Sequence, residues 1–317
     1  MSEKAINTIS SDSNKVLVTQ GDPNGIGLEV FFKSFIMLGR GSNSLFILYA
    51  SKEACEQTLC SMGLPFSVQP NYLLISNNLL PVIWCDGPAY DAYTRAISDL
   101  NRGDVLFTLP ASKKSFPGNM PGHTSHLRQT FNRSLSMFFS SPSKNVLLLT
   151  DHISLSKVEA SMSYDLIMDQ LLNVLVGAKT YLSKDFKKIF FSGINPHAGE
   201  NGILGNDLNI FLPALKELRS NFKQQEFIGP LSGDIIYHQA TECDLLVYSS
   251  HDQGLAPFKA MNHFIGANIT LGLDFLRLSV DHGTALDMFG LNKANYMGCL
   301  YCLELAVKAL GRYEKDA

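Results

Sequence analysis

Three histidines of this chain each follow an apolar, strand-like run, which is where an open α/β sheet displays its chemistry. Loops that leave the carboxyl ends of neighbouring strands meet at one edge of a sheet, so the three imidazoles could converge on one ion. Imidazole favours zinc, cobalt, nickel or iron, and weaker binding of Mg²⁺ or Mn²⁺ is also compatible with it. The residues are His152, His197 and His251, which follow the runs 145–150, 188–192 and 244–248.

Two kinds of chemistry are open to three imidazoles and one ion. An ion with free coordination positions would make a bound alcohol more acidic before hydride leaves. It could equally activate a water, as in a zinc hydrolase, although the chain lacks a HExxH motif. A histidine that follows a strand is also often an ordinary hydrogen-bonded loop residue. Position alone does not choose between these interpretations.

A second group of polar residues could hold an anion. Lys259, Asn268 and Arg277 carry donors suited to a phosphate or carboxylate, and charge-assisted bonds position small polar substrates well. His123 and Thr124 end a loop rich in Pro, Gly, Ser and Lys and add further donors. The competing interpretation is that each charge is solvated at the surface. Arg277 alternates with apolar neighbours, which favours a role in binding.

Strand-like runs alternate with helical stretches, which predicts an α/β layer architecture. The turn Gly21–Gly27 lies between the strand Lys15–Thr19 and a helix, as in dinucleotide-binding folds. The fingerprint fails because the third glycine of GxGxxG is missing. The turn is either an anion site or a loop without a ligand. Helices are expected over 28–38, 52–62, 89–101, 125–139, 163–181, 206–220, 284–289 and 294–312.

Composition excludes several classes of protein. With 317 residues, 45% of them hydrophobic, the chain can bury a large core and is expected to form two lobes. A net charge of -3, without basic runs, argues against nucleic acid as a partner. The N-terminus is polar, and no apolar run approaches the roughly 18 residues of a membrane span. We therefore expect a cytoplasmic protein with no membrane partner.

Six cysteines are scattered along the chain and are expected to be reduced thiols. The pair Cys299 and Cys302 has the spacing of a redox or zinc motif, but it lies in the expected helix 294–312 and no second CxxC completes a set of four. Free cysteine behaves as a small buried hydrophobe. Packing in the core is the favoured interpretation of this pair.

Several motifs, in order, resemble the 4-hydroxythreonine-4-phosphate dehydrogenase family of the vitamin B6 pathway. The resemblance implies an α/β fold like that of isocitrate and isopropylmalate dehydrogenases, with two α/β/α lobes, a central cleft and nicotinamide bound outside any Rossmann fold. It implies lobes formed by 1–110 plus about 285–317 and by 111–284. The motifs are Gly21–Gly27, Gly193–Gly202, Tyr248–Lys259, Asn268–Leu273 and Arg277–Ala285.

The resemblance also implies the reaction and its residues. His152, His197 and His251 would bind a divalent ion (Zn, Co, Mg or Mn), with His251 reaching across a homodimer. The enzyme would oxidise 4-phosphohydroxy-L-threonine with NAD, or NADP, and release CO2 to give 3-amino-2-oxopropyl phosphate for pyridoxal phosphate biosynthesis. The implied substrate-binding residues are His123, Thr124, Lys259, Asn268 and Arg277; the implied catalytic residues are the three histidines and Lys259.

The chain departs from the family pattern in the loops. Leu109 and Ser112 replace the glycine and histidine of a Gly-Pro-x-His-Lys loop, and Ser125 replaces a glutamate. The glycine-rich pattern near the C-terminus appears as Phe289–Ala294. These changes motivate two alternatives. One is a dehydrogenase of a related phosphorylated hydroxy acid, such as 4-phosphothreonate or 4-phosphoerythronate; the other is a non-catalytic relative that binds a metabolite.

Overall fold

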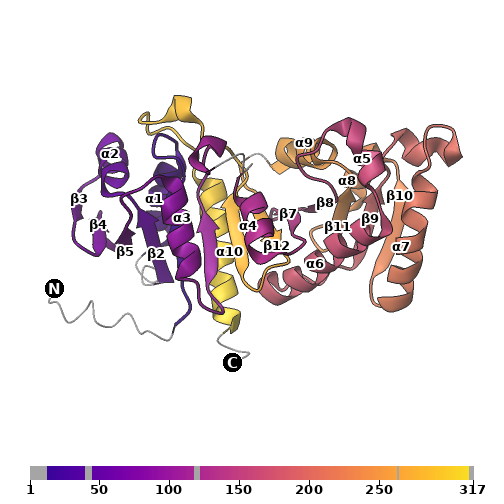
Figure 1. Cartoon of the computed structure of the whole chain (residues 1–317), viewed down its shortest axis with the longest axis horizontal. Helices are drawn as coiled ribbons and strands as arrows, with labels where there is room; N and C mark the ends of the chain where they lie inside the picture. Colours follow the sequence, from indigo (N-terminus) through magenta and orange to yellow (C-terminus); the bar gives the residue numbers. More distant parts are fainter. Residues whose placement is uncertain (1–12, 40–44, 118–121, 263, 314–317) are drawn as a thin grey trace. The chain divides into compact units, whose positions relative to one another are not determined.

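The computed structural model describes residues 13–39, 45–117, 122–262 and 264–313. The chain forms two compact units, one discontinuous and one continuous. Unit 1 comprises Met1–His126 and Asp274–Ala317, and unit 2 comprises Leu127–Leu273. The family resemblance implied boundaries near residues 110 and 285. Figure 1 shows the chain coloured from indigo to yellow, and the yellow C-terminal helix α10 belongs to the same unit as the indigo N-terminal elements.

The sheet of unit 1 is parallel at its centre and antiparallel at one edge. Its strand order is β13-β6-β1-β2-β5-β4-β3, in which β13 to β5 pair in parallel and the last two pairings are antiparallel. All residues of β1, β6 and β13 are buried, as expected of apolar strands covered on both faces. The strands are β1 (Val16–Thr19), β2 (Phe46–Ala50), β3 (Phe66–Val68), β4 (Tyr72–Ile75), β5 (Asn78–Trp84), β6 (Val105–Thr108) and β13 (Leu276–Val280).

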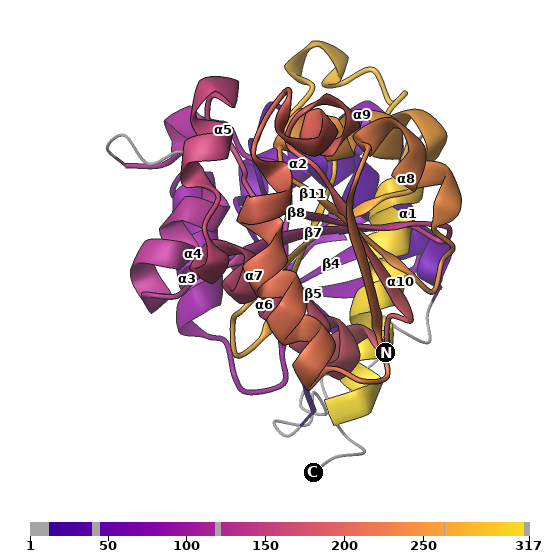
Figure 2. The same ribbon diagram turned by 90° about the vertical axis from the view of Figure 1, so that its right-hand side faces the viewer.

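Helices cover both faces of this sheet. Helix α1 (Gly27–Leu38) packs against α10 (Met297–Tyr313), and α3 (Ala89–Ser98) lies on the opposite side (Figure 2). Helix α2 (Lys52–Met62) shows local signals at both ends, because the Ser51 hydroxyl accepts a hydrogen bond from the Ala54 amide at 3.2 Å and Gly63 ends the helix with φ of 64°.

The sheet of unit 2 carries the histidines. Its order is β10-β9-β11-β8-β7-β12, parallel from β10 to β8 and antiparallel beyond. Helices α6 and α7 lie on one face and α8 and α9 on the other (Figure 2). The elements are β7 (Ser136–Ser140), β8 (Asn145–Leu148), β9 (Lys188–Ser192), β10 (Glu226–Leu231), β11 (Leu245–Tyr248), β12 (Ala267–Leu271), α5 (Leu155–Ser161), α6 (Tyr164–Leu182), α7 (Asp207–Asn221), α8 (Gly233–Gln239) and α9 (His251–Asn262).

The structure corrects several expected elements. The expected helix 125–139 is wrong in its second half, because α4 (His123–Phe131) is followed by Asn132 at φ of 48° and then by the fully buried strand β7. A short apolar run does not distinguish a helix from a buried strand. Helix α9, which contains Pro257, is absent from the expected helices. The helix expected over 284–289 is only the short 3-10 turn Leu286–Met288. Strand β10 and helices α5 and α8 were not predicted.

Two expectations from composition can be compared with the structure. Among the described residues, every helix is too short or too polar to cross a membrane. Cys299 and Cys302 are fully buried on α10, and burial raises the pKa of the Cys299 thiol to about 12. The Cys302 thiol donates to the Ser279 carbonyl at 3.5 Å. The prediction of core packing for this pair is confirmed.

Candidate active site

The three histidine-bearing loops leave three neighbouring parallel strands, β8, β11 and β9. Polar side chains tie these strand ends together. The Thr150 hydroxyl donates to the Ser249 carbonyl at 2.6 Å, and the Ser249 hydroxyl donates to the Ser192 carbonyl at 3.2 Å. The position of each histidine just beyond a strand, which the sequence predicted, is therefore correct. The loops share one edge of the sheet, as the topology of parallel strands requires.

His152 and His251 lie side by side. Their ring centroids are 5.2 Å apart. The Nδ1 atom of His251 lies 2.7 Å from the Asp252 carboxylate, a contact that engages Nδ1 and would leave Nε2 as the ligating atom. Both histidines line a cavity of about 210 Å³, whose other walls are Thr150, Ile153, Leu155, Ser250 and Asp252.

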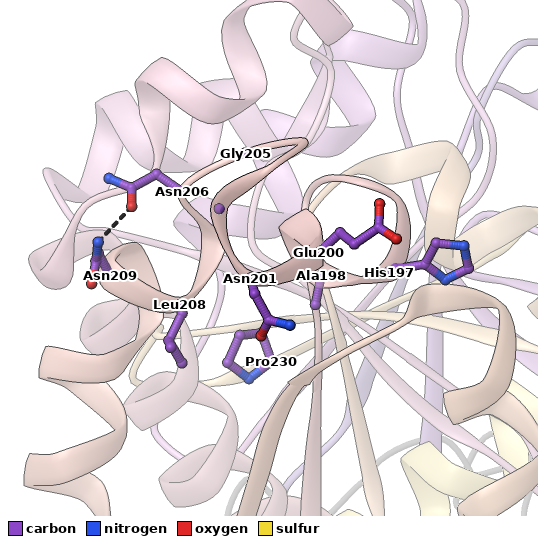
Figure 3. Close-up of a pocket in the computed structure, with 10 residues that line it drawn as sticks. His197, Ala198, Glu200, Asn201, Gly205, Asn206, Leu208, Asn209 and Pro230 are labelled. Carbon is purple, nitrogen blue, oxygen red and sulfur yellow. Dashed lines mark hydrogen bonds between the residues drawn. The ribbon is translucent and has the colours of Figure 1, made fainter.

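His197 lies in a separate, larger cavity of about 570 Å³ (Figure 3). Figure 3 shows His197 and Glu200 on one side of this cavity and Asn206 and Asn209 on the other. The remaining lining residues are Ala198, Asn201, Gly202, Gly205, Leu208 and Pro230. Within the part of the chain that the structure describes, no three His, Cys, Asp or Glu side chains are grouped as a metal site. One chain thus brings together two of the three predicted ligands.

Backbone strain marks two of the predicted ligands. His152 has φ of 51° and His197 has φ of 52°, a left-handed conformation that non-glycine residues seldom adopt. From His197 to Asn201 every φ lies between 45° and 79°. Such a run costs about 1–2 kcal/mol per non-glycine residue, and strain of this kind concentrates at functional sites. Exposed imidazoles on strained strand-end turns fit the donor set of a divalent ion that prefers nitrogen.

Unit 1 contains a buried guanidinium. Arg277 on β13 is only 3% exposed, and its Nε and Nη2 atoms donate to the Thr108 hydroxyl at 3.2 and 2.6 Å. Burial lowers the pKa of Arg277 to about 10, because the charged form loses solvation. A phosphate or carboxylate beside the guanidinium would offset this cost.

His123 is half-buried beside this guanidinium. It opens α4, and its ring lies 4.8 Å from the rings of both Tyr93 and Phe116. The pKa of His123 is well below its ordinary value, first because of burial and then because of the positive charge of Arg277. A neutral imidazole can donate one hydrogen bond to an anion without adding charge. Thr124, also half-buried, follows it on the same helix.

His126 is a residue that the sequence analysis missed. Its two ring nitrogens lie 3.2 Å from the Tyr90 hydroxyl and 3.1 Å from the Tyr93 hydroxyl. The spacing of three residues from His123 puts both histidines on one face of α4. That spacing was the available signal, but it depended on starting the helix at His123 rather than at Ser125.

Lys259 and Asn268 belong to unit 2. Lys259 is exposed on α9, two helical turns after His251. Asn268 lies on β12, and its side-chain oxygen is buried without a hydrogen-bond partner among the described residues. A buried acceptor of this kind is typical of a site that receives a ligand or water. The five expected substrate residues are thus divided, with His123, Thr124 and Arg277 in unit 1 and the other two in unit 2.

Comparison with known proteins identifies relatives of the whole chain. Residues 87–306 match the model of the pyridoxal phosphate biosynthetic protein PdxA family. The 4-hydroxythreonine-4-phosphate dehydrogenase of Sulfurihydrogenibium sp. (strain YO3AOP1) is 33% identical, over 92% of this chain and 97% of the relative. The D-threonate 4-phosphate dehydrogenase of Salmonella typhimurium is 30% identical, over 94% and 99%. The chain belongs to the 4-hydroxythreonine-4-phosphate dehydrogenase (PdxA) family. It is therefore an oxidoreductase of this family, as the resemblance predicted.

Solved structures support the same fold. A crystal structure of 4-hydroxythreonine-4-phosphate dehydrogenase from Klebsiella pneumoniae covers 94% of this chain and all of its own, with a TM-score of 0.74 and 26% identity. Isocitrate dehydrogenase from Methylococcus capsulatus has a TM-score of 0.50 at 14% identity, over 95% of this chain and 87% of its own, which shows a shared fold alone. The predicted isocitrate-dehydrogenase-like α/β fold is confirmed.

Two departures from the PdxA pattern have a structural explanation. Leu109 is fully buried, and a Cβ added at Gly27 would lie 3.1 Å from the Leu109 Cβ. Leu109 therefore packs into the core at the start of α1. Ser112 precedes the 3-10 turn Lys113–Ser115, and its hydroxyl lies 3.2 Å from that of Ser115. Part of the same expected loop, residues 118–121, lies outside the described residues.

Proposed function

We propose that this PdxA-family protein is a divalent-metal-dependent dehydrogenase that uses NAD, or NADP, to oxidise 4-phosphohydroxy-L-threonine and releases CO2 to give 3-amino-2-oxopropyl phosphate. The substrate's hydroxyl loses a proton, and its carbinol carbon transfers hydride to the nicotinamide. The resulting β-keto acid loses its carboxyl group as CO2, and the carbon that carried this group takes up a proton to give the ketone product. The observation that carries the proposal is Arg277, a guanidinium that is 3% exposed in a chain of this family. A buried guanidinium with several donors is well suited to bind a phosphate or carboxylate.

Different residues of this chain would bind the substrate and transfer a proton. Arg277, His123 and Thr124 of unit 1 are the proposed phosphate-binding residues, and Lys259 and Asn268 are the substrate-binding residues that the family resemblance implies in unit 2. His123 would donate as a neutral imidazole, which its lowered pKa supports. Lys259 is also the proposed residue for holding or moving a proton near the reacting groups.

We propose His152, His197 and His251 as the ligands of the divalent ion. Bound there, the ion would acidify the substrate hydroxyl and draw electrons from the departing carboxylate. The Asp252 carboxylate at 2.7 Å from His251 Nδ1 supports this assignment, because ligating histidines commonly have such a partner. Zinc or cobalt suits the nitrogen donors, and Mg²⁺ or Mn²⁺ is to be compared with them.

A homodimer is part of the proposal. One chain pairs His152 with His251 and leaves His197 in another cavity, so we propose that a second copy supplies one of the three histidines. The family resemblance assigns this role to His251, whereas the pairing within one chain leaves His197 as the separate ligand. Apolar side chains beside both cavities support a covered surface, since Leu155 is 74% and Ile203 is 78% exposed.

The test is an assay of NADH formation by the purified full-length protein. We expect NADH with 4-phosphohydroxy-L-threonine, loss of turnover after chelation, and recovery when Zn²⁺, Co²⁺, Mg²⁺ or Mn²⁺ is added back singly. No NADH with any ion, together with retained binding of the phosphorylated substrate, would contradict the proposal and point to a non-catalytic binder. Turnover of an ester or amide without nicotinamide would point to a hydrolase.

A second candidate substrate class is favoured by a specific observation. The relative named D-threonate 4-phosphate dehydrogenase is 30% identical to this chain, nearly as similar as the 33% identical relative. Ser125, where the family pattern has glutamate, lies in the first turn of α4 beside His123 and Thr124. A hydroxyl in place of a carboxylate removes a negative charge beside the proposed phosphate-binding residues and so alters the groups that can contact the substrate there. A higher kcat/KM for 4-phosphothreonate or 4-phosphoerythronate would select this alternative.

A further inference from the structure

The loop that carries His197 is unusual in its backbone. It runs in the left-handed region from His197 to Asn201, with four non-glycine residues among the five. A single chain segment does not hold such a conformation by its own preference. Contacts from outside the loop must therefore stabilise it.

Asp207, the first residue of α7, holds the segment that leads into this loop. Its side chain is fully buried. One carboxylate oxygen accepts hydrogen bonds from the backbone amides of Ile194 at 2.6 Å and Asn195 at 3.0 Å. The other oxygen accepts from the side-chain amide of Asn195 at 2.8 Å. Asp207 thus fixes the two residues through which β9 enters the His197 turn.

Three glycines make room for this carboxylate. A Cβ added at Gly193 would lie 2.8 Å from Asp207 Oδ1, and one added at Gly199 or Gly205 would lie 2.8 or 2.9 Å from Oδ2. Gly199 belongs to the left-handed run itself, with φ of 79°. The backbone therefore approaches the Asp207 carboxylate closely at three points of the chain: before the turn at Gly193, within it at Gly199 and after it at Gly205.

We propose that Asp207 is a positioning residue that sets the orientation of His197 for metal binding. The proposal rests on the ligand role of His197 proposed above. Asp207 lies ten residues beyond His197 and acts through the backbone of residues 194 and 195, two positions before the histidine. A carboxylate accepts all three hydrogen bonds at once, which no neutral side chain of similar size can do.

Asp244 provides a matched control at the other end of the same strand. It is also buried, at 5% exposure, and accepts three hydrogen bonds: from the Lys188 amide at 3.1 Å, the Thr241 amide at 2.9 Å and the Thr241 hydroxyl at 2.7 Å. Lys188 begins β9, whereas Ile194 follows the end of this strand. The two aspartates therefore have similar structural roles, and only Asp207 faces the histidine turn.

The experiment compares Asp207→Asn with Asp244→Asn in the full-length, chelator-treated protein. In asparagine an NH2 group replaces one of the two carboxylate oxygens. Whichever way the amide is turned, this donor then faces another donor. Both variants should therefore lose a similar few degrees of thermal stability. The probe is Co²⁺, titrated against each variant. We expect Asp207→Asn to weaken Co²⁺ binding by about 10- to 100-fold and Asp244→Asn to leave it within about twofold.

Hydrogen exchange gives a readout that does not depend on metal. The amides of residues 193–205 should exchange faster in Asp207→Asn than in the wild type, and they should keep wild-type protection in Asp244→Asn. If Asp207→Asn does not yield folded protein, Asn195→Ala removes one hydrogen bond to the carboxylate and should shift both readouts in the same direction to a smaller extent.

His197→Ala separates the two proposals. Wild-type Co²⁺ affinity in His197→Ala would overturn the ligand assignment of the proposed function. Weakened binding in His197→Ala, together with wild-type binding in Asp207→Asn, would overturn the positioning role alone. Equal weakening of Co²⁺ binding in Asp207→Asn and Asp244→Asn would also overturn it, because loss of stability would then explain both effects.

Discussion

The two units present their polar residues to ligands in opposite ways. In unit 1 the key cation is buried, with Arg277 at 3% exposure and His123 half-enclosed by aromatic rings. In unit 2 the imidazoles of His152 and His197 are exposed on turns with left-handed backbone. The burial of a charged group is thus the main cost in unit 1, and backbone strain is the main cost in unit 2.

This difference concerns the state of the binding residues in each unit before a ligand binds. A buried guanidinium has already lost its hydration during folding, so an anion that meets it recovers interaction energy without further reorganisation. An exposed histidine keeps its hydration, and its usefulness depends on how firmly its turn is held. We therefore expect substitutions in unit 1 to act on substrate affinity and on pH dependence, and those in unit 2 to act on metal affinity.

Replacement of Arg277 should give the largest effect. We expect Arg277→Ala to weaken binding of the phosphorylated substrate by about 2–5 kcal/mol, or roughly 30-fold to several thousand-fold, because a desolvated charge pair is lost. Isothermal titration of phosphorylated and dephosphorylated substrate would measure it. The matched control is Arg219→Ala, which removes a guanidinium that donates through Nε and Nη2 to one acceptor, the Phe227 carbonyl. Equal wild-type affinity for the two substrate forms would contradict the role of Arg277.

His123 should give a smaller, pH-dependent effect. Its pKa in the folded protein is well below the ordinary value near 6.5, so the unfolded chain binds the proton more readily. Stability should therefore be unaffected by this group above about pH 6.5. It should decrease as the pH falls from there toward the lowered pKa, by at most about 1.4 kcal/mol per pH unit.

Denaturant unfolding at a series of pH values would measure this loss. His123→Gln should flatten the acid side of the profile, and the exposed His238→Gln should leave it as in the wild type. The groups that face His123 are Arg277, Tyr93 and His126, so His126→Gln is a useful second comparison. An unchanged acid slope in His123→Gln would show that its proton is not linked to folding.

The elements that the sequence predicted best were those with a strong local signal. Helix α2 has the expected bounds, Lys52–Met62, and each of the three histidines follows a strand. The failures had a common cause. The run after Ser134 was assigned to a helix because a buried antiparallel strand such as β7 has no alternating pattern. Helix α9 was missed because Gly254 and Pro257 lie within it, where local propensity argues for a turn.

The sequence predicted the residues of the candidate site, but it did not predict the residues that hold them in position. Motifs named Arg277 and the histidines, whereas nothing in their spacing pointed to Asp207 or to the pairing of Tyr90 and Tyr93 with His126. Each of these contacts joins residues whose meeting depends on tertiary packing. The same holds for Leu109, which appears in the sequence as a lost glycine and in the structure as a core residue against Gly27.

The weakest expected effect is at the His152 turn, where the support is an ion pair instead of a buried carboxylate. Arg128 donates to both oxygens of Asp151 at 3.3 and 2.9 Å and to the Leu135 carbonyl at 2.9 Å. The side chains of Arg128 and Asp151 are 33% and 14% exposed, so solvent and salt screen the pair. We expect Asp151→Asn to cost about 0.2–1 kcal/mol of stability, less at high salt.

Co²⁺ titration at low and high ionic strength would show whether this pair also orients His152. We expect Asp151→Asn to weaken Co²⁺ binding a few-fold at low salt and hardly at all at high salt, since the wild-type pair is itself screened there. Arg95→Ala, which breaks the exposed pair with Asp99, is the control and should not change Co²⁺ affinity. Asp151→Asn could instead weaken Co²⁺ binding as much as is expected for Asp207→Asn, and equally at low and high salt. This result would mean that the ion pair holds the His152 turn as rigidly as the buried Asp207 carboxylate holds the His197 turn.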